Sequence, residues 1–430
     1  MSETVRSDAL RRGTDAFVAR FEGLRAHLPG PAAARDAAAV LFGQAGFPSV
    51  RDEAWRYTSL RALADVTFRE PLTSIDRDLA ALPPIPAVDG PRVVFVDGRL
   101  RADLSDIPDA MGFADFAHHP APAGLARPDR ETLVALNTML SEDGAGFTIA
   151  PGVDAGTVML VNLATETDGH STAFHPRHHI RLGEGARLSV IEVAVGQGVY
   201  LHNPVTEITV GPGATLTHVR LQDEAPGAFH LSTVYAEIQA GGFYDTFTLG
   251  LGARVARAEF HANLVGPGAV AHLNAAQLLT GNQVGDVTTV VAHDAPGCSS
   301  RQAVKNVLSG RSRGVFQGRI EVARVAQKTD GYQMSQALLL SPDAEIDCKP
   351  ELQIYADDVK CSHGATIGEL NADQLFYLQA RGIPHAQARM MLIRAFLDDA
   401  LAAVTDPAAI ALLEAAVDGW WARQPEGSHA

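Results

Sequence analysis

The densest group of reactive side chains lies in the last quarter of the sequence, between Lys349 and Thr366. Cys361 and His363 stand two residues apart there, so on a β-strand the thiol and the imidazole would face the same side. Thiolate and imidazole suit soft or borderline metals, including iron–sulfur units, and the adjacent Lys360 favours the thiolate. Two ligands do not complete a site, so the others must come from elsewhere in the chain or from a partner. The alternative is a buried cysteine and a hydrogen-bonded histidine in a tight turn.

The histidines form two further patterns. Four of them crowd into ten residues: His170, His175, His178 and His179. Within this set, His175-x-x-His178 could ligate a metal from a turn, or all four are solvated loop and strand residues. A second set recurs at intervals of 28, 31 and 32 residues: His202, His230, His261 and His293. This spacing predicts a structural ladder of stacked rings along one face of a repetitive fold.

Motifs typical of several enzyme classes are absent from the sequence. It has no Gly-x-x-x-x-Gly-Lys-Ser/Thr loop, so the chain has no phosphate-loop ATP site of its own. It also has no Gly-x-Ser-x-Gly elbow and no His-Glu-x-x-His pair. Asp357 and Asp358 are neighbours and would face opposite sides of a strand, whereas a glycosidase needs two convergent carboxylates.

The elements that position the Cys361–His363 pair belong to a β-rich region from about residue 155 to 368. Short β-prone runs alternate there with small-residue turns, most clearly Gly183-Glu184-Gly185-Ala186 and Gly211-Pro212-Gly213-Ala214. The first small residues of these turns fall at 183, 211, 241, 266, 310, 341 and 362. Such spacing predicts a solenoid with tight corners, including one at Ser362–Ala365. The alternative is a β-sandwich with glycine hairpins, but those should recur every ~8–12 residues.

The regions on either side of the repeats are predominantly helical. Helices are predicted over Ser7–His27, Ala32–Gln44 and Glu131–Leu140, with a strand at Arg92–Val96 followed by an Asp97-Gly98 hairpin signal. The proline-rich run Leu82–Pro86 predicts a stiff linker. We therefore divide the chain into a mixed, mainly helical region (1–150), a solenoid core (151–368) and a C-terminal helical region (369–430).

The C-terminal region predicts helices that begin at Asn371, Pro384 and Asp406-Pro407. They carry more apolar side chains than one buried stripe needs, including a methionine pair of the kind found on adaptable binding faces. The residues predicted to bind a partner are Phe376, Met390, Met391, Ile393, Phe396 and Leu397. The alternative is an ordinary helical cap that covers the last solenoid turn.

Composition limits the partners. The chain has 430 residues and a net charge of −15, which disfavours nucleic acid and anionic membranes. The start MSETVRSDAL has no apolar core, so no signal peptide is expected, and three cysteines predict a reduced protein in the cytoplasm. The only four lysines fall between Lys305 and Lys360, either by chance or because this window needs a compact ammonium group.

Three segments resemble the SufB/SufD family of iron–sulfur cluster assembly proteins. The run from Lys360 to Gly368, followed by Leu375–Leu378 and Arg381–Ile383, resembles the family signature, and Glu351–Ile354 resembles its upstream block. Glu53–Thr58, around Trp55, resembles the short motif of the SufD branch. The resemblance covers about residues 155–400 and the Trp55 motif.

The resemblance implies a right-handed parallel β-helix with helical flanks and a non-enzymatic role in cluster assembly. It implies a hetero-oligomer with the paralogue SufB and the ABC-type ATPase SufC, or a homodimer when the chain is alone. ATP would be bound only by the ATPase, which the C-terminal helices would dock. A transient iron–sulfur cluster would be shared with the paralogue at the position of His363, with Cys361 as a second candidate ligand.

Two alternatives remain open at this point. One is a β-helix carbohydrate-active enzyme, which the absence of a signal peptide and the Cys-x-His motif disfavour. The other is the SufB paralogue itself, disfavoured because no cysteine precedes Cys298. The sulfur-accepting cysteine of the family belongs to SufB, so that role is not transferred to Cys298 or Cys348.

Overall fold

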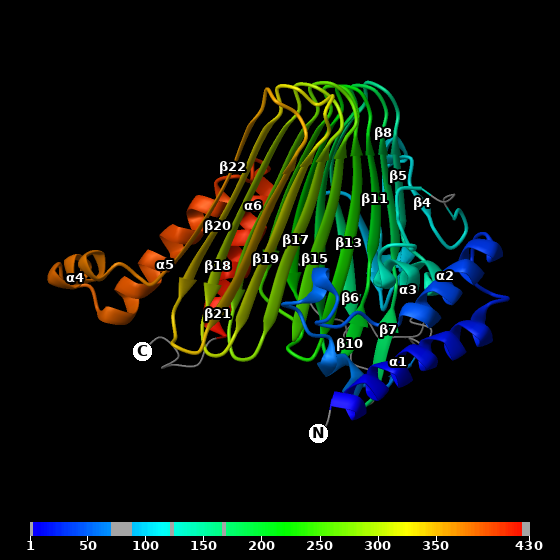
Figure 1. The fold of residues 1–430 in the computed structure, drawn as a ribbon, viewed down its shortest axis with the longest axis horizontal. Helices are drawn as coiled ribbons and strands as arrows, with labels where there is room; N and C mark the ends of the chain where they lie inside the picture. The colour runs from blue at the N-terminus through cyan, green and yellow to red at the C-terminus, as the bar shows by residue number, and fades with distance from the viewer. Residues whose placement is uncertain (1–2, 70–87, 121–123, 166–168, 424–430) are drawn as a thin grey trace.

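The computed structural model describes residues 3–69, 88–120, 124–165 and 169–423. Long parallel strands stack into a flattened solenoid, with helices beside its first turns and beside its last turns (Figure 1). The fold is mainly β, as the small-residue turns predicted. The predicted linker Leu82–Pro86 lies outside the described residues.

Two sheets form the walls of the solenoid, and successive long strands alternate between them. The strand order in the first sheet is β21-β19-β17-β15-β13-β11-β8-β5-β4, with β1, β7 and β10 beside this path. Its strands are β1 (Phe68–Arg69), β4 (Ala114–Asp115), β5 (Ala145–Ile149), β7 (Ser171–Phe174), β8 (Arg177–Leu182), β10 (Tyr200–His202), β11 (Val205–Val210), β13 (Phe229–Ile238), β15 (Val255–Leu264), β17 (Val284–His293), β19 (Arg313–Val322) and β21 (Glu345–Ile354).

The second sheet has the order β22-β20-β18-β16-β14-β12-β9-β6-β2-β3. Its strands are β2 (Arg92–Val96), β3 (Arg99–Leu100), β6 (Asp154–Ala164), β9 (Arg187–Gly196), β12 (Thr215–Asp223), β14 (Phe243–Gly250), β16 (Val270–Leu279), β18 (Ser299–Leu308), β20 (Asp330–Leu339) and β22 (Lys360–Gly368). Because β2 and β5 pair in parallel with β6 and β8, the solenoid takes in strands before residue 151.

The predicted corners at Gly183, Gly211 and Gly310 are confirmed as bends between parallel strands of the two sheets. At Gly211 a Cβ atom would lie 2.5 Å from the carbonyl oxygen of Leu182 in the preceding turn, so only glycine fits. The corner predicted at Ser362–Ala365 is wrong, because these residues lie within β22. No further turn follows β22, since the chain leaves the solenoid after Gly368.

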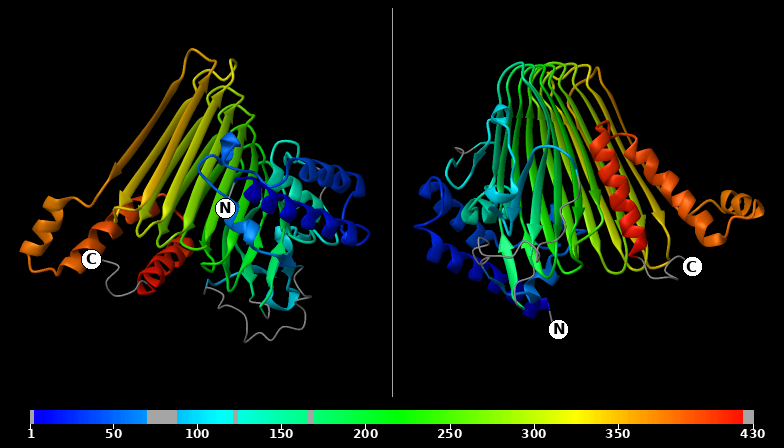
Figure 2. Two further views of the ribbon diagram at one scale, coloured as in Figure 1. Left: turned by 60° about the horizontal axis from the view of Figure 1, so that its bottom comes forward. Right: turned by 180° about the vertical axis from the view of Figure 1, so that it is seen from behind.

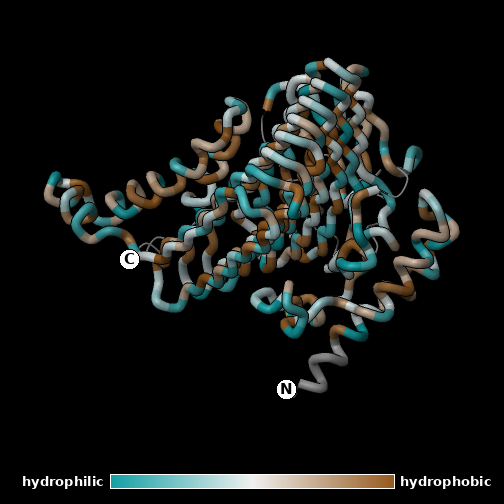
Figure 3. The backbone as a smooth tube through the Cα atoms, turned by 45° about the horizontal axis from the view of Figure 1, so that its top comes forward, coloured by the Kyte–Doolittle hydropathy of each residue, from teal (hydrophilic) through white to brown (hydrophobic). Residues whose placement is uncertain are grey.

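Hydrophobic and hydrophilic residues alternate along the solenoid strands (Figure 3), because successive side chains point to opposite faces of each sheet. The aliphatic core between the sheets includes Ile180, Val190 and Ile208. The last strands of the two sheets, β21 and β22, each pair on one side only, and no described segment covers them. The solenoid is therefore open at its C-terminal end.

The N-terminal helices are α1 (Glu3–Leu24), α2 (Ala32–Ala45) and α3 (Thr132–Leu140), close to the predicted ranges. They pack together through residues such as Phe21 and Phe42, with Trp55, against the first sheet. The predicted hairpin is also confirmed, since β2 and β3 pair antiparallel around Asp97 and Gly98. Both turn residues have positive φ (48° and 80°), as the twist of a two-residue hairpin requires.

The C-terminal helices are α4 (Ala372–Ala380), α5 (His385–Leu401) and α6 (Pro407–Ala422). α5 and α6 lie along the second sheet, where Leu397 and Leu413 pack with Val193 and Leu221 (Figure 2). α4 projects away from the solenoid and buries none of its residues. The helices cover a side of the solenoid rather than its last turn, contrary to the cap alternative. No described helix is long and apolar enough to cross a membrane.

Candidate functional site at the open end of the solenoid

The predicted Cys361–His363 pair lies on β22, the last strand of the solenoid. Cys361 pairs with Gly331 of β20, and His363 pairs with the fully buried Gln333. Cys361 packs partly against Ile320 and its neighbours in the hydrophobic interior. His363 follows on the same face of the strand but is exposed, because no further turn covers it. The structure thus presents the imidazole to a partner and keeps the thiol half-buried.

The thiol of Cys361 differs from the sequence expectation. Burial raises its pKa, and the charge of Asp330 raises it further, so the protonated thiol is favoured. Lys360 is not among the groups that shift this pKa, and the predicted stabilisation of the thiolate is therefore wrong. Lys360 instead lines an open cavity of about 470 Å³ with Asp330, whose carboxylate pairs with Arg301 at 2.9 Å.

Sequence reasoning missed a second thiol at the same end. Cys348 lies on β21, the last strand of the other sheet, and packs partly against Phe316. Burial raises its pKa as well as that of the fully buried Cys298. Counting the turns from Gly310 would have placed Cys348 and Cys361 on the final turn. All three cysteines are free thiols.

The predicted partner-binding residues separate into two groups. Phe376, Met390 and Met391 are 71%, 44% and 45% exposed. Ile393 and Leu397 are only 3% and 1% exposed, because they pack in the core beneath α5. Phe396 is part-buried, and its ring lies 4.6 Å from the ammonium nitrogen of Lys305. In the single chain, only the first group is available to a partner.

Two of the four clustered lysines make contacts that suit a compact ammonium group. Lys305 Nζ is held by the Phe396 carbonyl oxygen at 3.1 Å and by the carboxylate of Asp399. Lys349 Nζ lies 2.8 Å from Glu53 and 3.0 Å from Glu351. Lys349 therefore joins the last turn to the Trp55 motif, because Glu53 belongs to that motif.

The Trp55 motif is anchored to the first sheet. Trp55 is 5% exposed, and the guanidinium of Arg257 lies 4.2 Å from its ring centroid. Thr58 also hydrogen-bonds to the carboxylate of Asp286. These contacts give the motif a structural role in closing the N-terminal region over the solenoid.

The predicted ladder of four histidines is wrong beyond its first two members. The rings of His202 and His230 lie 4.8 Å apart, but His261 pairs in register with Tyr235 and stacks on it at 4.7 Å. His293 bonds to Ser300 instead. The reason is that β13 and β15 are offset by 26 residues, so an interval of 31 moves His261 along the strand.

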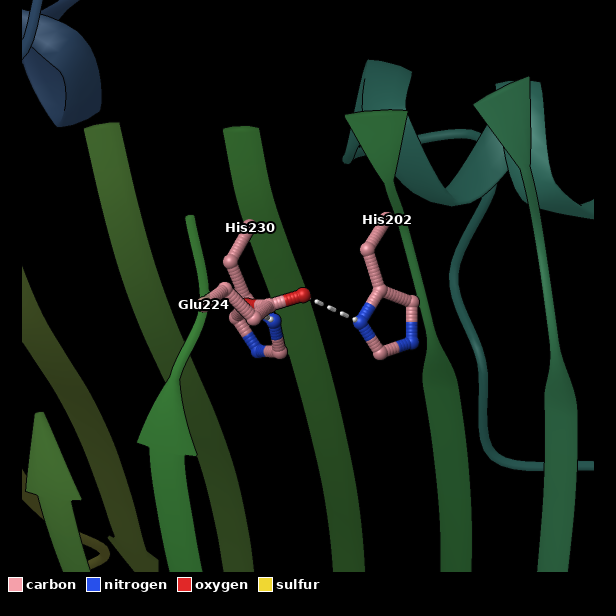
Figure 4. A group of neighbouring side chains, drawn as sticks. All are labelled: His202, Glu224 and His230. Carbon is pink, nitrogen blue, oxygen red and sulfur yellow. Dashed lines mark hydrogen bonds and ion pairs between the residues drawn. The ribbon is translucent and has the colours of Figure 1, made fainter. Parts of the chain in front are cut away.

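His202, Glu224 and His230 form a buried cluster inside the first sheet (Figure 4). The Nδ1 atoms of His202 and His230 lie 3.1 Å and 2.7 Å from the two oxygens of Glu224. Burial by itself would raise the pKa of Glu224, but the two histidines hold it well below its ordinary value. Gln222 donates a further hydrogen bond at 3.0 Å, so this carboxylate is fully partnered.

The His175-x-x-His178 pair does not converge on one site. His175 faces Asn203 at 3.2 Å, and Nδ1 of His178 accepts a hydrogen bond from the backbone N–H of Ala145 at 3.0 Å. Among the described residues, the groups of three or more possible ligands with mutually close donor atoms lie elsewhere.

We expect His178 to make the protein sensitive to acid. Burial lowers the pKa of His178 from 6.5 to about 4. The unfolded chain therefore takes up this proton before the folded chain does, and stability falls as the pH drops from 6.5 towards 4. Between pH 7 and 5 the loss is about 2 kcal/mol for this one residue. Urea unfolding at both pH values measures it, and His178→Asn, which keeps an acceptor for Ala145, should reduce the pH dependence by that amount. An unchanged pH dependence in the variant would contradict this assignment.

The fold and the site define a class of protein. The chain is a parallel β-solenoid whose metal-binding side chains lie on an exposed edge rather than in a closed cleft. The family model for the SUF system FeS cluster assembly SufBD core domain matches residues 163–396. The chain belongs to this SufBD family of iron–sulfur cluster assembly proteins.

Curated relatives extend the similarity over most of the chain. The iron–sulfur cluster assembly protein SufD of Escherichia coli K12 is 35% identical over 84% of this chain and 86% of its own length. Protein ABCI7, chloroplastic, of Arabidopsis thaliana is 30% identical over 84% and 80%, respectively. An iron–sulfur cluster assembly SufBD family protein of Synechocystis is 30% identical over 85% and 86%. These matches include the N-terminal or C-terminal flanks as well as the solenoid.

Proposed function

We propose that this chain is the SufD-type component of a cytoplasmic iron–sulfur cluster assembly complex. It pairs with a SufB-type paralogue through the open end of its solenoid and with a SufC-type ATPase through its C-terminal helices. A transient cluster forms where the two solenoids meet. The chain contributes shape and ligands and is not itself an enzyme. The observation that carries the proposal is the uncovered last turn, which brings His363 and two thiols to an edge.

The uncovered edge supports pairing with a paralogue. The outer edges of β21 and β22 have no strand partner among the described residues, and Ile354 and Ile367 beside them are 38% and 57% exposed. Unpaired strand edges offer rows of backbone donors and acceptors that another chain can extend. A paralogue with the same solenoid would present a matching pair of edges, so both sheets could continue across the interface.

The donor set supports a shared cluster. His363 is exposed at this edge, and neutral imidazole is an established ligand of iron in [2Fe–2S] centres. Cys361 is a weaker candidate, because burial raises the pKa of its thiol. Iron–sulfur clusters need about four ligands, so the paralogue must supply those that this motif lacks.

The exposed apolar residues of α4 and α5 support ATPase docking. Phe376 and Tyr377 are 71% and 58% exposed on a helix that makes no buried contact in the chain. The sequence has no phosphate loop, so ATP hydrolysis would be the task of the partner alone. Membership in the SufBD family does not favour the carbohydrate-active alternative.

Co-purification tests this proposal. The tagged full-length chain would be expressed with the SufB-type and SufC-type proteins of the same genome, and the eluate analysed by size and composition. All three proteins should elute as one complex that carries iron and sulfide when purified without oxygen. Elution of the tagged chain alone, with the other two proteins present in soluble form, would count against it.

A further inference from the structure

A cavity of about 190 Å³ lies between the N-terminal region and the first sheet, away from the open end. Strands β15, β17, β19 and β21 form its floor, and Ala54 of the Trp55 motif lies at its wall. Its polar lining includes Glu131, Glu259, His261 and Lys349. The role proposed above does not use this cavity.

Three possible metal ligands converge in the cavity. Glu131 comes from the residue before α3, whereas Glu259 and His261 stand two residues apart on β15 and face the same side. Their donor atoms all lie within 4.8 Å of one another, and Nε2 of His261 lies 3.1 Å from Glu259. Stacking on Tyr235 at an interplanar angle of 12° fixes the orientation of the His261 ring.

The charges around the cavity leave Glu131 without compensation. Each nearby cation already pairs with another carboxylate, as the following pairs show: Lys349 with Glu53 and Glu351, Arg319 with Glu321, and Arg257 with Glu259 and Asp286. Glu131 makes no hydrogen bond or ion pair among the described residues. Burial and the charge of Glu259 raise the pKa of Glu131 to about 7, which reflects the cost of two close carboxylates without a cation. The hydroxyl of the nearby Tyr235 is also buried without a hydrogen-bond partner.

We propose that this cavity binds one divalent first-row transition-metal ion through Glu131, Glu259 and His261. Two carboxylates and one imidazole form a donor set suited to Mn²⁺, Fe²⁺ or Zn²⁺, whereas Mg²⁺ and Ca²⁺ prefer oxygen ligands alone. The cavity has room for water molecules that complete the coordination. Arg257 remains on the second oxygen of Glu259 and orients that carboxylate.

The other cluster of three donors in the described chain is a poorer metal site. Both oxygens of Glu224 face histidines, and Gln222 donates to the same carboxylate. His202, Glu224 and His230 are all almost completely buried. The contrast between a satisfied, sealed cluster and an unsatisfied one beside a cavity favours the Glu131 group.

Mn²⁺ binding to the metal-stripped full-length chain tests the proposal. Mn²⁺ is the probe because its electron paramagnetic resonance signal distinguishes free from bound ion and because thiolates bind it poorly. The wild-type chain should bind about one Mn²⁺, which excess Mg²⁺ does not displace. Glu131→Gln and His261→Gln should each weaken binding by about 10–100-fold or more, since even the loss of a group behind a ligand has an effect of this size.

Two control variants locate the ion. His272→Gln alters another histidine beside a carboxylate, Asp245 at 3.7 Å, where no third donor is present, and His230→Gln alters the sealed cluster. Both should bind Mn²⁺ as the wild type does, and circular dichroism confirms that each variant is folded. The proposal is overturned if the wild-type chain binds no Mn²⁺, if Glu131→Gln binds it unchanged, or if a folded His230→Gln chain loses it. None of these outcomes depends on complex formation, so the test is separate from that of the proposed function.

Discussion

The double variant Phe376→Asp, Met391→Asp should lose capture of the SufC-type ATPase while the chain stays folded. The two side chains are 71% and 45% exposed, so their replacement removes little of the core. Apolar residues at the centre of an interface typically contribute about 2 kcal/mol or more each, which corresponds to about 30-fold in affinity per residue. Affinity capture of the purified ATPase, followed by titration calorimetry, measures the loss.

Val325→Asp is a matched control for this variant. Val325 is 66% exposed on the turn after β19, away from the C-terminal helices, so this change should leave ATPase capture intact. Truncation after Gly368 is a poorer test, because removal of α5 and α6 would also uncover Val193 and Leu221 of the second sheet. Full binding by the double variant would move the docking surface away from α4 and α5.

His363→Ala should depress cluster assembly strongly while the complex still forms. His363 is exposed on β22 and buries little, so its loss should change stability by no more than about 0.5 kcal/mol. If its imidazole ligates iron, the iron and sulfide content of the reconstituted complex should fall by about tenfold or more. Cys361→Ser should have a smaller effect, since burial raises the pKa of this thiol and disfavours the thiolate.

Ser362→Ala provides the control on the same strand. Ser362 is exposed like its neighbour but faces the opposite side of β22, so its variant should assemble clusters normally. Iron and sulfide are measured only in complexes that elute at the wild-type size, and complementation in cells gives a second readout. Wild-type cluster content in the His363→Ala complex would mean that this histidine is not a ligand.

Much of the fold could be predicted from local patterns in the sequence. The corners at Gly183, Gly211 and Gly310 were recognisable because tight turns with close backbone approach restrict the residue type strongly. The helix beginning at Asn371 was recognisable for the same kind of local reason, since its side chain accepts a hydrogen bond from the backbone N–H of Gln374. The two-residue spacing of Cys361 and His363 likewise required only that they lie on a strand.

The sequence by itself could not predict which of these side chains are buried. Ile393 and Met391 are close neighbours on one apolar helix, yet only Ile393 packs against the solenoid. The raised pKa of Cys361 depends on residues of β19 and β20 that stack beside it. Burial of this kind depends on how whole elements pack, whereas periodicity records only which side of its own element a residue faces.

The sequence determined the local conformation of the chain, and the tertiary structure determined which distant residues meet. The solenoid turns differ in length, so the same interval that brings His230 onto His202 brings His261 onto Tyr235 instead. The cavity with Glu131, Glu259 and His261 arises because the N-terminal region folds back onto β15. No spacing in the sequence specifies this approach, since it results from the packing of Trp55 and the aromatic helices against the finished sheet.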